Sequence, residues 1–187
     1  MRVIAGSAGG IRLDVPKTDV RPTMDRVKAA IFSSIGELVI GARVLDLFAG
    51  TGALGIEALS RGAASAMFVD ENRNAVAAIE RNLARAKVTG IVRQQEVFRF
   101  LQRAVGMEPF TIVFADPPYE KTTGGEAYTD LLLRDAIIPQ LVERGGLFVL
   151  EKRPDQKVIG SSQWDVTRAR KYGATEVLFL RPRTFAE

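Results

Sequence analysis

Asp116-Pro117-Pro118-Tyr119 is the stretch whose residue types are best suited to chemistry. Two consecutive prolines remove two backbone N–H donors and stiffen the chain directly after an apolar run. The carbonyl of Pro117 and the carboxylate of Asp116 are then acceptors, and Tyr119 provides a flat ring on which a base can stack. This set suits the exocyclic amino group of a base such as guanine or adenine, because acceptors can bind its two N–H groups.

The absence of histidine and cysteine restricts how such an amino group could react. Without an imidazole or a thiolate, the chain lacks the commonest general base and a soft metal ligand. Acceptors on the N–H groups direct the nitrogen lone pair away from the ring and toward an electrophile, so the proton can leave after attack. We therefore expect direct transfer with positioning as the main catalytic device. The predicted catalytic residues are Asp116, Pro117, Pro118 and Tyr119.

A glycine-rich turn earlier in the chain predicts a ligand of another kind. Val44–Leu47 has the pattern of a buried strand, Ala49-Gly50-Thr51-Gly52 breaks it, and a helical pattern follows. Strand, turn and helix in this order can present backbone N–H groups to a cofactor. A Walker loop is excluded because no Lys-Ser/Thr follows Gly52. Three interpretations of the turn by itself stay open: a dinucleotide, S-adenosylmethionine, or a tight turn without a ligand.

The elements that must position these residues alternate from Arg43 onward. The pattern predicts a doubly wound, mostly parallel seven-stranded sheet with an antiparallel C-terminal strand, an α/β fold of Rossmann-like type. Two late runs, Val166–Arg170 and Glu176–Leu180, are expected to form a terminal antiparallel hairpin. The other predicted strands are Val44–Leu47, Ala66–Val69, Ile91–Gln94, Phe110–Ala115 and Gly146–Leu150. The predicted helices between them are Ala53–Arg61, Arg73–Ala86, Phe98–Val105 and one within Glu126–Glu143.

The first 41 residues are expected to be an extension laid against the main domain, which would span 42–187. Val3–Ala5 and Ile11–Val15 flank a glycine-rich link and predict a β-hairpin. A helix is expected from Met24 to about Ser34, with Thr23 as its N-cap.

Acidic or glycine residues follow five successive predicted strands, at the sheet edge where α/β proteins bind ligands. This recurrence favours S-adenosylmethionine, with Asp46 and the turn at its methionine end, Asp70 on its ribose hydroxyls and Glu96 on its adenine amino group. Two interpretations of Glu151 stay open: a place at this edge of the sheet, or an ion pair with Lys152 or Arg153. The predicted cofactor-binding residues are Asp46, Phe48, Ala49, Gly50, Gly52, Asp70, Glu96 and Val97. No metal site is expected.

The 187-residue chain carries a net charge of +4, which permits a polyanionic partner without requiring one. Arg21 and Arg26 are candidates to close over the cofactor or to hold phosphate, and surface ion pairs with Asp19 or Asp25 are the alternative. Basic residues near the N-terminus are expected to contact RNA, whereas charge clusters in general are more often solvated surface. These basic residues are Arg12, Lys17, Arg21, Arg26 and Lys28. Trp164 is expected in the core. No apolar stretch has the length of a membrane span and no signal peptide is visible, so a cytoplasmic monomer is the expectation.

The quoted motifs resemble those of class I S-adenosylmethionine-dependent methyltransferases that modify amino groups. Nearly the whole chain is similar to one family, the bacterial 16S rRNA (guanine-N2)-methyltransferases of the RsmD type. Its signatures are matched by Arg2-Val3-Ile4-Ala5-Gly6, by Arg21-Pro22-Thr23-Met24-Asp25-Arg26-Val27, and by Ala53 to Ala63 after the turn. Departures are Glu96, where Asp or Asn is commoner, and Met24, where Thr is usual.

The resemblance implies transfer of a methyl group from S-adenosylmethionine to N2 of one guanine in 16S rRNA, within an assembling small ribosomal subunit. By position, it implies that Asp46, Gly50, Gly52 and Asp70 bind the cofactor, and that Asp116 to Tyr119 hold the guanine. Two alternatives stay open at this point. One is an N6-adenine DNA methyltransferase, and the other is a non-catalytic RNA-binding assembly factor.

Overall fold

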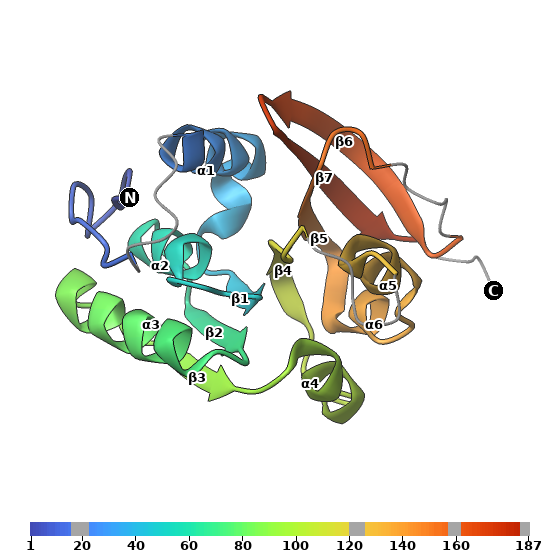
Figure 1. Cartoon of the computed structure of the whole chain (residues 1–187), viewed down its shortest axis with the longest axis horizontal. Coiled ribbons are helices and arrows are strands. Elements are labelled where there is room, and N and C mark those ends of the chain that lie inside the picture. Colours follow the sequence, from blue (N-terminus) through green and yellow to red (C-terminus); the bar gives the residue numbers. More distant parts are fainter. Residues whose placement is uncertain (16–22, 120–125, 157–161, 184–187) are drawn as a thin grey trace.

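The computed structural model describes residues 1–15, 23–119, 126–156 and 162–183, and within them a single seven-stranded sheet has the order β3-β2-β1-β4-β5-β7-β6 (Figure 1). Neighbours among β1 to β5 are parallel, whereas β7 is antiparallel to both β5 and β6. The predicted fold class is thereby confirmed. The strands are β1 (Arg43–Leu47), β2 (Ser65–Asp70), β3 (Ile91–Gln94), β4 (Phe110–Ala115), β5 (Val142–Lys152), β6 (Trp164–Tyr172) and β7 (Thr175–Pro182).

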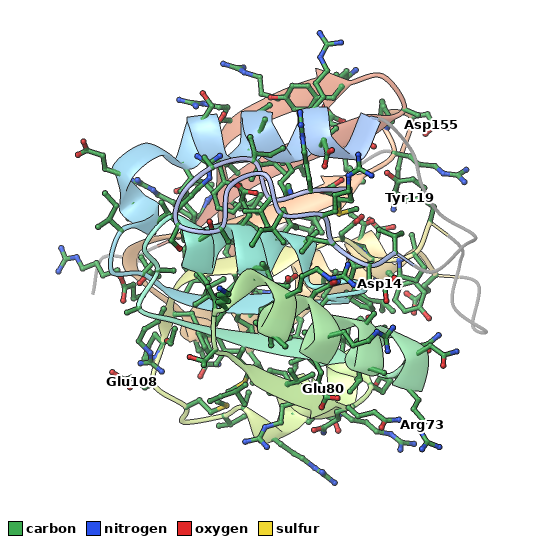
Figure 2. The ribbon with its side chains drawn as sticks, turned by 90° about the vertical axis from the view of Figure 1, so that its left-hand side faces the viewer. Asp14, Arg73, Glu80, Glu108, Tyr119 and Asp155 are labelled. Carbon is green, nitrogen blue, oxygen red and sulfur yellow. The ribbon has the colours of Figure 1, made fainter. Side chains whose placement is uncertain are left out.

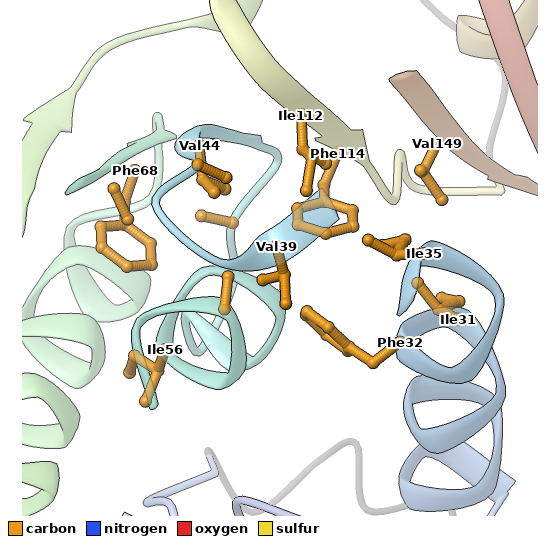
Figure 3. Packing of buried hydrophobic residues seen from close by; sticks show 14 of the residues in the cluster. Ile31, Phe32, Ile35, Val39, Val44, Ile56, Phe68, Ile112, Phe114 and Val149 are labelled. Carbon is orange, nitrogen blue, oxygen red and sulfur yellow. The ribbon is translucent and has the colours of Figure 1, made fainter. Parts of the chain in front are cut away.

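Helices cover both faces of the sheet, and each face has its own apolar cluster (Figure 1). On one face, Phe32, Ile56 and Ile79 pack with Phe68 and Phe114 of the sheet, as Figure 3 shows in part. This face carries α1 (Thr23–Ile35), η1 (Gly36–Val39), α2 (Ala53–Ser60) and α3 (Arg73–Ala86). The opposite face carries α4 (Val97–Arg103), α5 (Tyr128–Arg134) and α6 (Ile138–Leu141). None of these helices is long and apolar enough to cross a membrane.

The region 126–143, where the sequence predicts one helix, holds two short helices. Asp135 divides them, because its Oδ1 accepts from the N–H groups of Ile137 and Ile138 at 2.8 and 3.1 Å and so begins a new helix. β5 then starts at Val142, earlier than predicted, and its register against β4 shifts between Phe110 and Ile112. These differences leave the carboxyl ends of β4 and β5 side by side.

The N-terminal segment lies as a hairpin whose two arms pair at one bridge, Arg2 with Arg12. A longer ladder does not form because α2 takes its donors. The N–H groups of Ile4 and Ala5 bind the carboxylate of Glu57 at 2.7 and 3.1 Å. The segment also contributes Val3 to the apolar cluster of the first face. The domain boundary at residue 41 stays a prediction.

Glu57 is the centre of a buried ionic group that joins this segment to α1 and α2. Its carboxylate is fully buried and pairs with Lys28 at 3.3 Å and with Arg61 at 2.7 Å. Lys28 also donates to the carbonyl of Arg2 at 2.5 Å. Lys28, one of the basic residues expected to contact RNA, is therefore a buried structural residue, and that expectation is wrong for it.

Removing the Glu57 carboxylate should destabilise the protein strongly, because Lys28 would stay buried without its counter-ion. We expect Glu57→Ala to lower the free energy of unfolding by about 3–5 kcal/mol in denaturant titrations. The matched control is the ion pair between Arg81 and Asp14, which are 2.9 Å apart. Their side chains are 56% and 41% exposed. Arg81→Ala should cost less than about 1 kcal/mol. Equal losses in the two variants would contradict a special role for burial at Glu57.

Candidate active site

Asp46 is the most deeply buried acid at the carboxyl edge of the sheet. It lies in β1, is 2% exposed, and its Oδ2 accepts from the N–H of Gly55 at 2.9 Å. Burial, the largest cause, and the charges of Asp116 and Asp70 together raise the pKa of the Asp46 carboxyl to about 8, against the lowering effect of the Gly55 N–H. A positively charged ligand bound beside Asp46 would stabilise the ionised carboxylate and lower its pKa.

The turn after β1 has the strained shape that glycine permits. Gly50 and Gly52 have φ of +55° and +75°. A Cβ on Gly52 would come within 3.3 Å of Ile56 and Ile79, whereas one on Gly50 would meet only the carbonyl of Phe48, at 3.9 Å. Gly52 therefore packs against the helices, and the backbone at Gly50 is open to close approach by a ligand. Phe48 itself has φ +56°, an uncommon conformation for a residue with a side chain.

Asp70, at the end of β2, holds this turn from the neighbouring strand. Its Oδ2 accepts from the N–H of Gly50 at 2.8 Å, and its Oδ1 accepts from the N–H of Asn72 at 2.9 Å. A carboxylate offers about four acceptor positions, so each oxygen can still accept one hydroxyl. The expected contact of Asp70 with ribose stays a prediction, and the structure adds a positioning role on the turn.

Glu96 caps α4. Its two carboxylate oxygens accept from the N–H groups of Phe98 and Arg99 at 2.9 and 2.8 Å. The side chain of Val97 is buried in the apolar cluster of the second face. The adenine contacts expected of Glu96 and Val97 stay predictions, because the geometry gives both residues a structural part as well.

Three aromatic rings gather beside the turn, and only Phe48 was expected here. Its ring lies edge-on to Tyr128 at 5.6 Å between centroids and to Phe98 at 6.5 Å, and Phe98 stacks on Tyr128 at 6.3 Å. Phe98 and Tyr128 belong to the first turns of α4 and α5. They form an apolar wall next to the glycine turn. This wall could not be predicted from the sequence, since the three residues lie far apart along the chain.

Asp116-Pro117-Pro118-Tyr119 leaves the sheet directly after β4, as predicted. Pro117 is buried and Pro118 is exposed. The hydroxyl of Tyr119 lies 3.1 Å from that of Thr175, at the turn between β6 and β7. The guanidinium of Arg153 stands over the Tyr119 ring, 5.1 Å from its centroid. Figure 2 shows Tyr119 and Asp155 near each other, with Glu108 on the far side of the molecule.

Glu151 belongs to the group of acids at the strand ends. Lys152, one of its two expected ion-pair partners, pairs instead with Glu176 at 2.7 Å. Burial raises the pKa of Glu151 well above its usual value, and the charges of Asp116 and Asp46 add to that shift. The order of β1, β4 and β5 in the sheet places Asp46, Asp116 and Glu151 together. Among the described residues these acids do not form a cluster that could hold a metal.

Two arginines near the N-terminus, Arg21 and Arg26, are the predicted substrate contacts. Arg21 lies outside the described residues. Arg26 is exposed on α1 and pairs with no carboxylate in the described part of the chain. Trp164 is 3% exposed and packs on Phe148, which confirms its expected place in the core.

The strand order and the antiparallel β7 define a Rossmann-like methyltransferase fold. The Thermus thermophilus protein described as 16S rRNA N2 G1207 methyltransferase (RsmC), in complex with AdoMet and guanosine, shares it. The two superpose with a TM-score of 0.70 over 89% of this chain and 44% of that one, at 22% identity, so the likeness is one of fold.

The chain belongs to the family described as "Conserved hypothetical protein 95", whose model matches residues 1–181. A Bacillus subtilis relative named "Putative rRNA methyltransferase YlbH" is 39% identical over 98% of this chain and all of its own length. Escherichia coli "Ribosomal RNA small subunit methyltransferase D" is 37% identical over 65% of this chain and 61% of its own. The structure described as "Putative methyltransferase yhhF from Escherichia coli" has a TM-score of 0.78 at 31% identity, covering 99% of both chains. The chain is thus a member of the RsmD-like family.

The raised pKa of Asp46 makes the stability of the ligand-free protein depend on pH. The carboxyl titrates near 3.8 in the unfolded chain and near 8 in the folded one. Between these values the folded state holds a proton that the unfolded state has lost, so stability falls as pH rises. Asp46→Asn keeps an acceptor for Gly55 and removes this titration. We expect its free energy of unfolding to fall less steeply across that window, by up to about 1.4 kcal/mol per pH unit.

Denaturant titrations at a series of pH values measure these slopes. Asp165→Asn serves as the control, because the Asp165 side chain is 59% exposed. A slope for Asp46→Asn equal to that of the wild type would mean that Asp46 is already ionised in the folded protein.

Proposed function

We propose that this protein transfers a methyl group from S-adenosylmethionine to the exocyclic N2 amino group of a guanine in 16S rRNA of the small ribosomal subunit. The observation that carries the proposal is the position of Asp116-Pro117-Pro118-Tyr119. It leaves the sheet at the end of β4, the strand next to β1 with Asp46 and the glycine turn. An acceptor set for an amino group therefore stands beside a candidate cofactor turn.

The charges at the strand ends support S-adenosylmethionine over a dinucleotide. The charge of Asp116 raises the pKa of both Asp46 and Glu151, Asp46 adds to the shift of Glu151, and Asp70 adds to that of Asp46. A diphosphate would raise the pKa of these carboxyls further, whereas a ligand with an ammonium and a sulfonium would favour their ionised form and pair with it. When bound, S-adenosylmethionine supplies an electrophilic methyl group. Asp46 and the turn from Phe48 to Gly52 would hold its methionine end, with Asp70 and Glu96 toward its ribose and adenine.

On the substrate side, the chain's own groups act by binding and orientation. The carboxylate of Asp116 and the carbonyl of Pro117 would accept the two N–H groups of the amino nitrogen. Tyr119 would stack on the base, with its ring already fixed by Thr175 and Arg153. A guanine inside folded RNA has to be turned out of its stack to reach this position. The amino proton is lost after methyl transfer, so no strong base is needed.

The relatives support RNA as the substrate. The B. subtilis protein is named a "putative rRNA methyltransferase", and the E. coli protein is named a methyltransferase of small-subunit ribosomal RNA. The RsmC structure shows that the same fold holds AdoMet together with guanosine in another protein.

Transfer of a tritiated methyl group tests this proposal directly. The acceptors are naked 16S rRNA and assembled small subunits, both from cells that lack this activity, with DNA alongside. We expect label in one of the RNA acceptors, and nucleoside analysis should find N2-methylguanosine. Label only in DNA, as N6-methyl-2′-deoxyadenosine, would favour the DNA enzyme. Binding of RNA without any transfer would favour a non-catalytic assembly factor.

Asp116→Ala should separate catalysis from cofactor binding. Loss of the acceptor leaves the amino group unoriented, so kcat should fall by about 100-fold or more. The Kd for S-adenosylmethionine, measured by calorimetry, should change by less than about threefold, because Asp116 is placed on the substrate side. Glu108→Ala is the control, since Glu108 is 78% exposed on the far side of the molecule (Figure 2). Near-normal turnover by Asp116→Ala would refute the assignment.

A further inference from the structure

The outer hairpin of β6 and β7 places three arginines on one face of the sheet. In an antiparallel pair, residues directly opposite each other share a face. Arg168 is opposite Phe179, and Arg170 is opposite Val177. Phe179 and Val177 pack in the cluster that α1 covers, so both arginines lie on the α1 side. Arg181, two residues beyond Phe179 in β7, lies on that side too.

These three residues, here named the arginine stripe, carry charge that the described residues do not neutralise. All three side chains are exposed, and none pairs with a carboxylate of the described ranges. Asp165 stands opposite Arg181 in register, but its carboxylate accepts from Arg183 at 2.7 Å. The stripe is therefore a concentrated positive surface. Charged residues on an edge strand often prevent pairing with the edge of another sheet. That role does not require them to share one face.

A hollow of about 250 Å³ opens at the outer part of the stripe, between α1 and the hairpin. Two of its lining residues are stripe arginines, and two others carry hydroxyl groups. A guanidinium matches the geometry of phosphate oxygens with two parallel N–H donors, and the hydroxyl of Ser34 can add a further donor. The hydroxyl of Thr167 already donates to the carbonyl of Phe179 at 2.9 Å. The lining residues are Ser34, Leu147, Thr167, Arg168, Phe179 and Arg181.

The stripe leads away from the candidate active site. β6 ends at Tyr172, and the turn that follows brings Thr175 to 3.1 Å from the hydroxyl of Tyr119. From that end, Arg170 comes first along β6 and Arg168 follows about 7 Å further, two residues away on an antiparallel strand. A nucleic acid strand whose base stacks on Tyr119 would thus have its backbone close to the start of the stripe.

We propose that the arginine stripe binds the phosphates of the RNA that flanks the methylated guanine. The proposal rests on the proposed function, since it takes the base at Tyr119 as its starting point. It assigns to Arg168, Arg170 and Arg181 a substrate-binding role that is separate from methyl transfer. The stripe should raise the affinity for RNA and should leave cofactor binding and the chemical step unchanged.

The double variant Arg168→Gln/Arg170→Gln tests this role. We expect its KM for the RNA acceptor to rise tenfold or more, with kcat at saturating RNA and the Kd for S-adenosylmethionine unchanged. In filter binding to 16S rRNA, the slope of log K against log salt should become shallower by about 0.7 for each arginine removed, as for contacts to single-stranded phosphates. The control Arg103→Gln/Arg144→Gln removes the same charge from exposed positions outside the hairpin and should match the wild type.

The outcomes separate this proposal from the proposed function. A double variant with wild-type KM and salt slope overturns the stripe, while its methyl transfer leaves the proposed function intact. If the wild-type chain transfers no methyl group to any RNA, the proposed function fails. The salt slopes of the wild type and the double variant then test the arginine stripe by themselves. Equal slopes for wild type and variant then overturn it, and a shallower slope in the variant supports it. Methyl transfer to DNA with the same arginine dependence would overturn RNA as the partner.

Discussion

The burial of the Asp46 carboxyl at the carboxyl edge of the sheet is the constraint on which the site depends. One backbone N–H, from Gly55, is the hydrogen bond that accompanies this burial. The sheet order then brings Asp116 and Glu151 to the neighbouring strand ends. There the charge of Asp116 disfavours ionisation of Asp46 and of Glu151, and the charge of Asp46 disfavours ionisation of Glu151. Such an arrangement costs stability in the ligand-free protein, and the apolar clusters on both faces of the sheet must offset that cost. We expect this arrangement to favour a cationic ligand, because bound positive charge would stabilise the ionised carboxylates.

The glycine turn beside Asp46 is held from two directions by residues far away in the sequence. Asp70 binds the N–H of Gly50, and Asn82 of α3 donates to the carbonyl of Thr51 at 2.9 Å. The same Asn82 side chain accepts from the N–H of Asp14 at 2.6 Å, so the N-terminal segment and the turn share one buried amide. Together with Glu57, this contact explains why the N-terminal residues belong to the architecture of the site. A turn fixed in this way needs little reorganisation when a ligand binds.

The sequence was sufficient for features whose signal is local. Hydrophobic runs predicted the parallel strands, and glycines predicted the turn. Acidic residues at the predicted strand ends indicated Asp46, Asp70 and Asp116 as site residues. The strand ends differ by a few residues, as expected where hydrogen bonds rather than side-chain pattern decide. The sequence could not indicate Asn82 or the contact of Tyr119 with Thr175, since the paired residues are 31 to 68 positions apart. Nor could the sequence reveal that Lys28 is buried against Glu57. The residue type alone does not distinguish a buried lysine of a helix from an exposed one.

In the proposed function, the acids of the site bind a cationic cofactor and the arginines of the hairpin bind phosphates. Acids that attract a cationic cofactor repel a polyanion, so the phosphates of an RNA substrate would have to be held elsewhere. With a net charge of only +4, the chain cannot rely on a uniformly basic surface. The antiparallel β6–β7 hairpin extends the sheet beyond β5, away from β1 and the acids, and offers a face to which α1 is the neighbour (Figure 1). Arg153 over Tyr119 stands between the two regions. An order of charge from acids through the stacking tyrosine to the stripe would direct a base inward and keep its backbone outside.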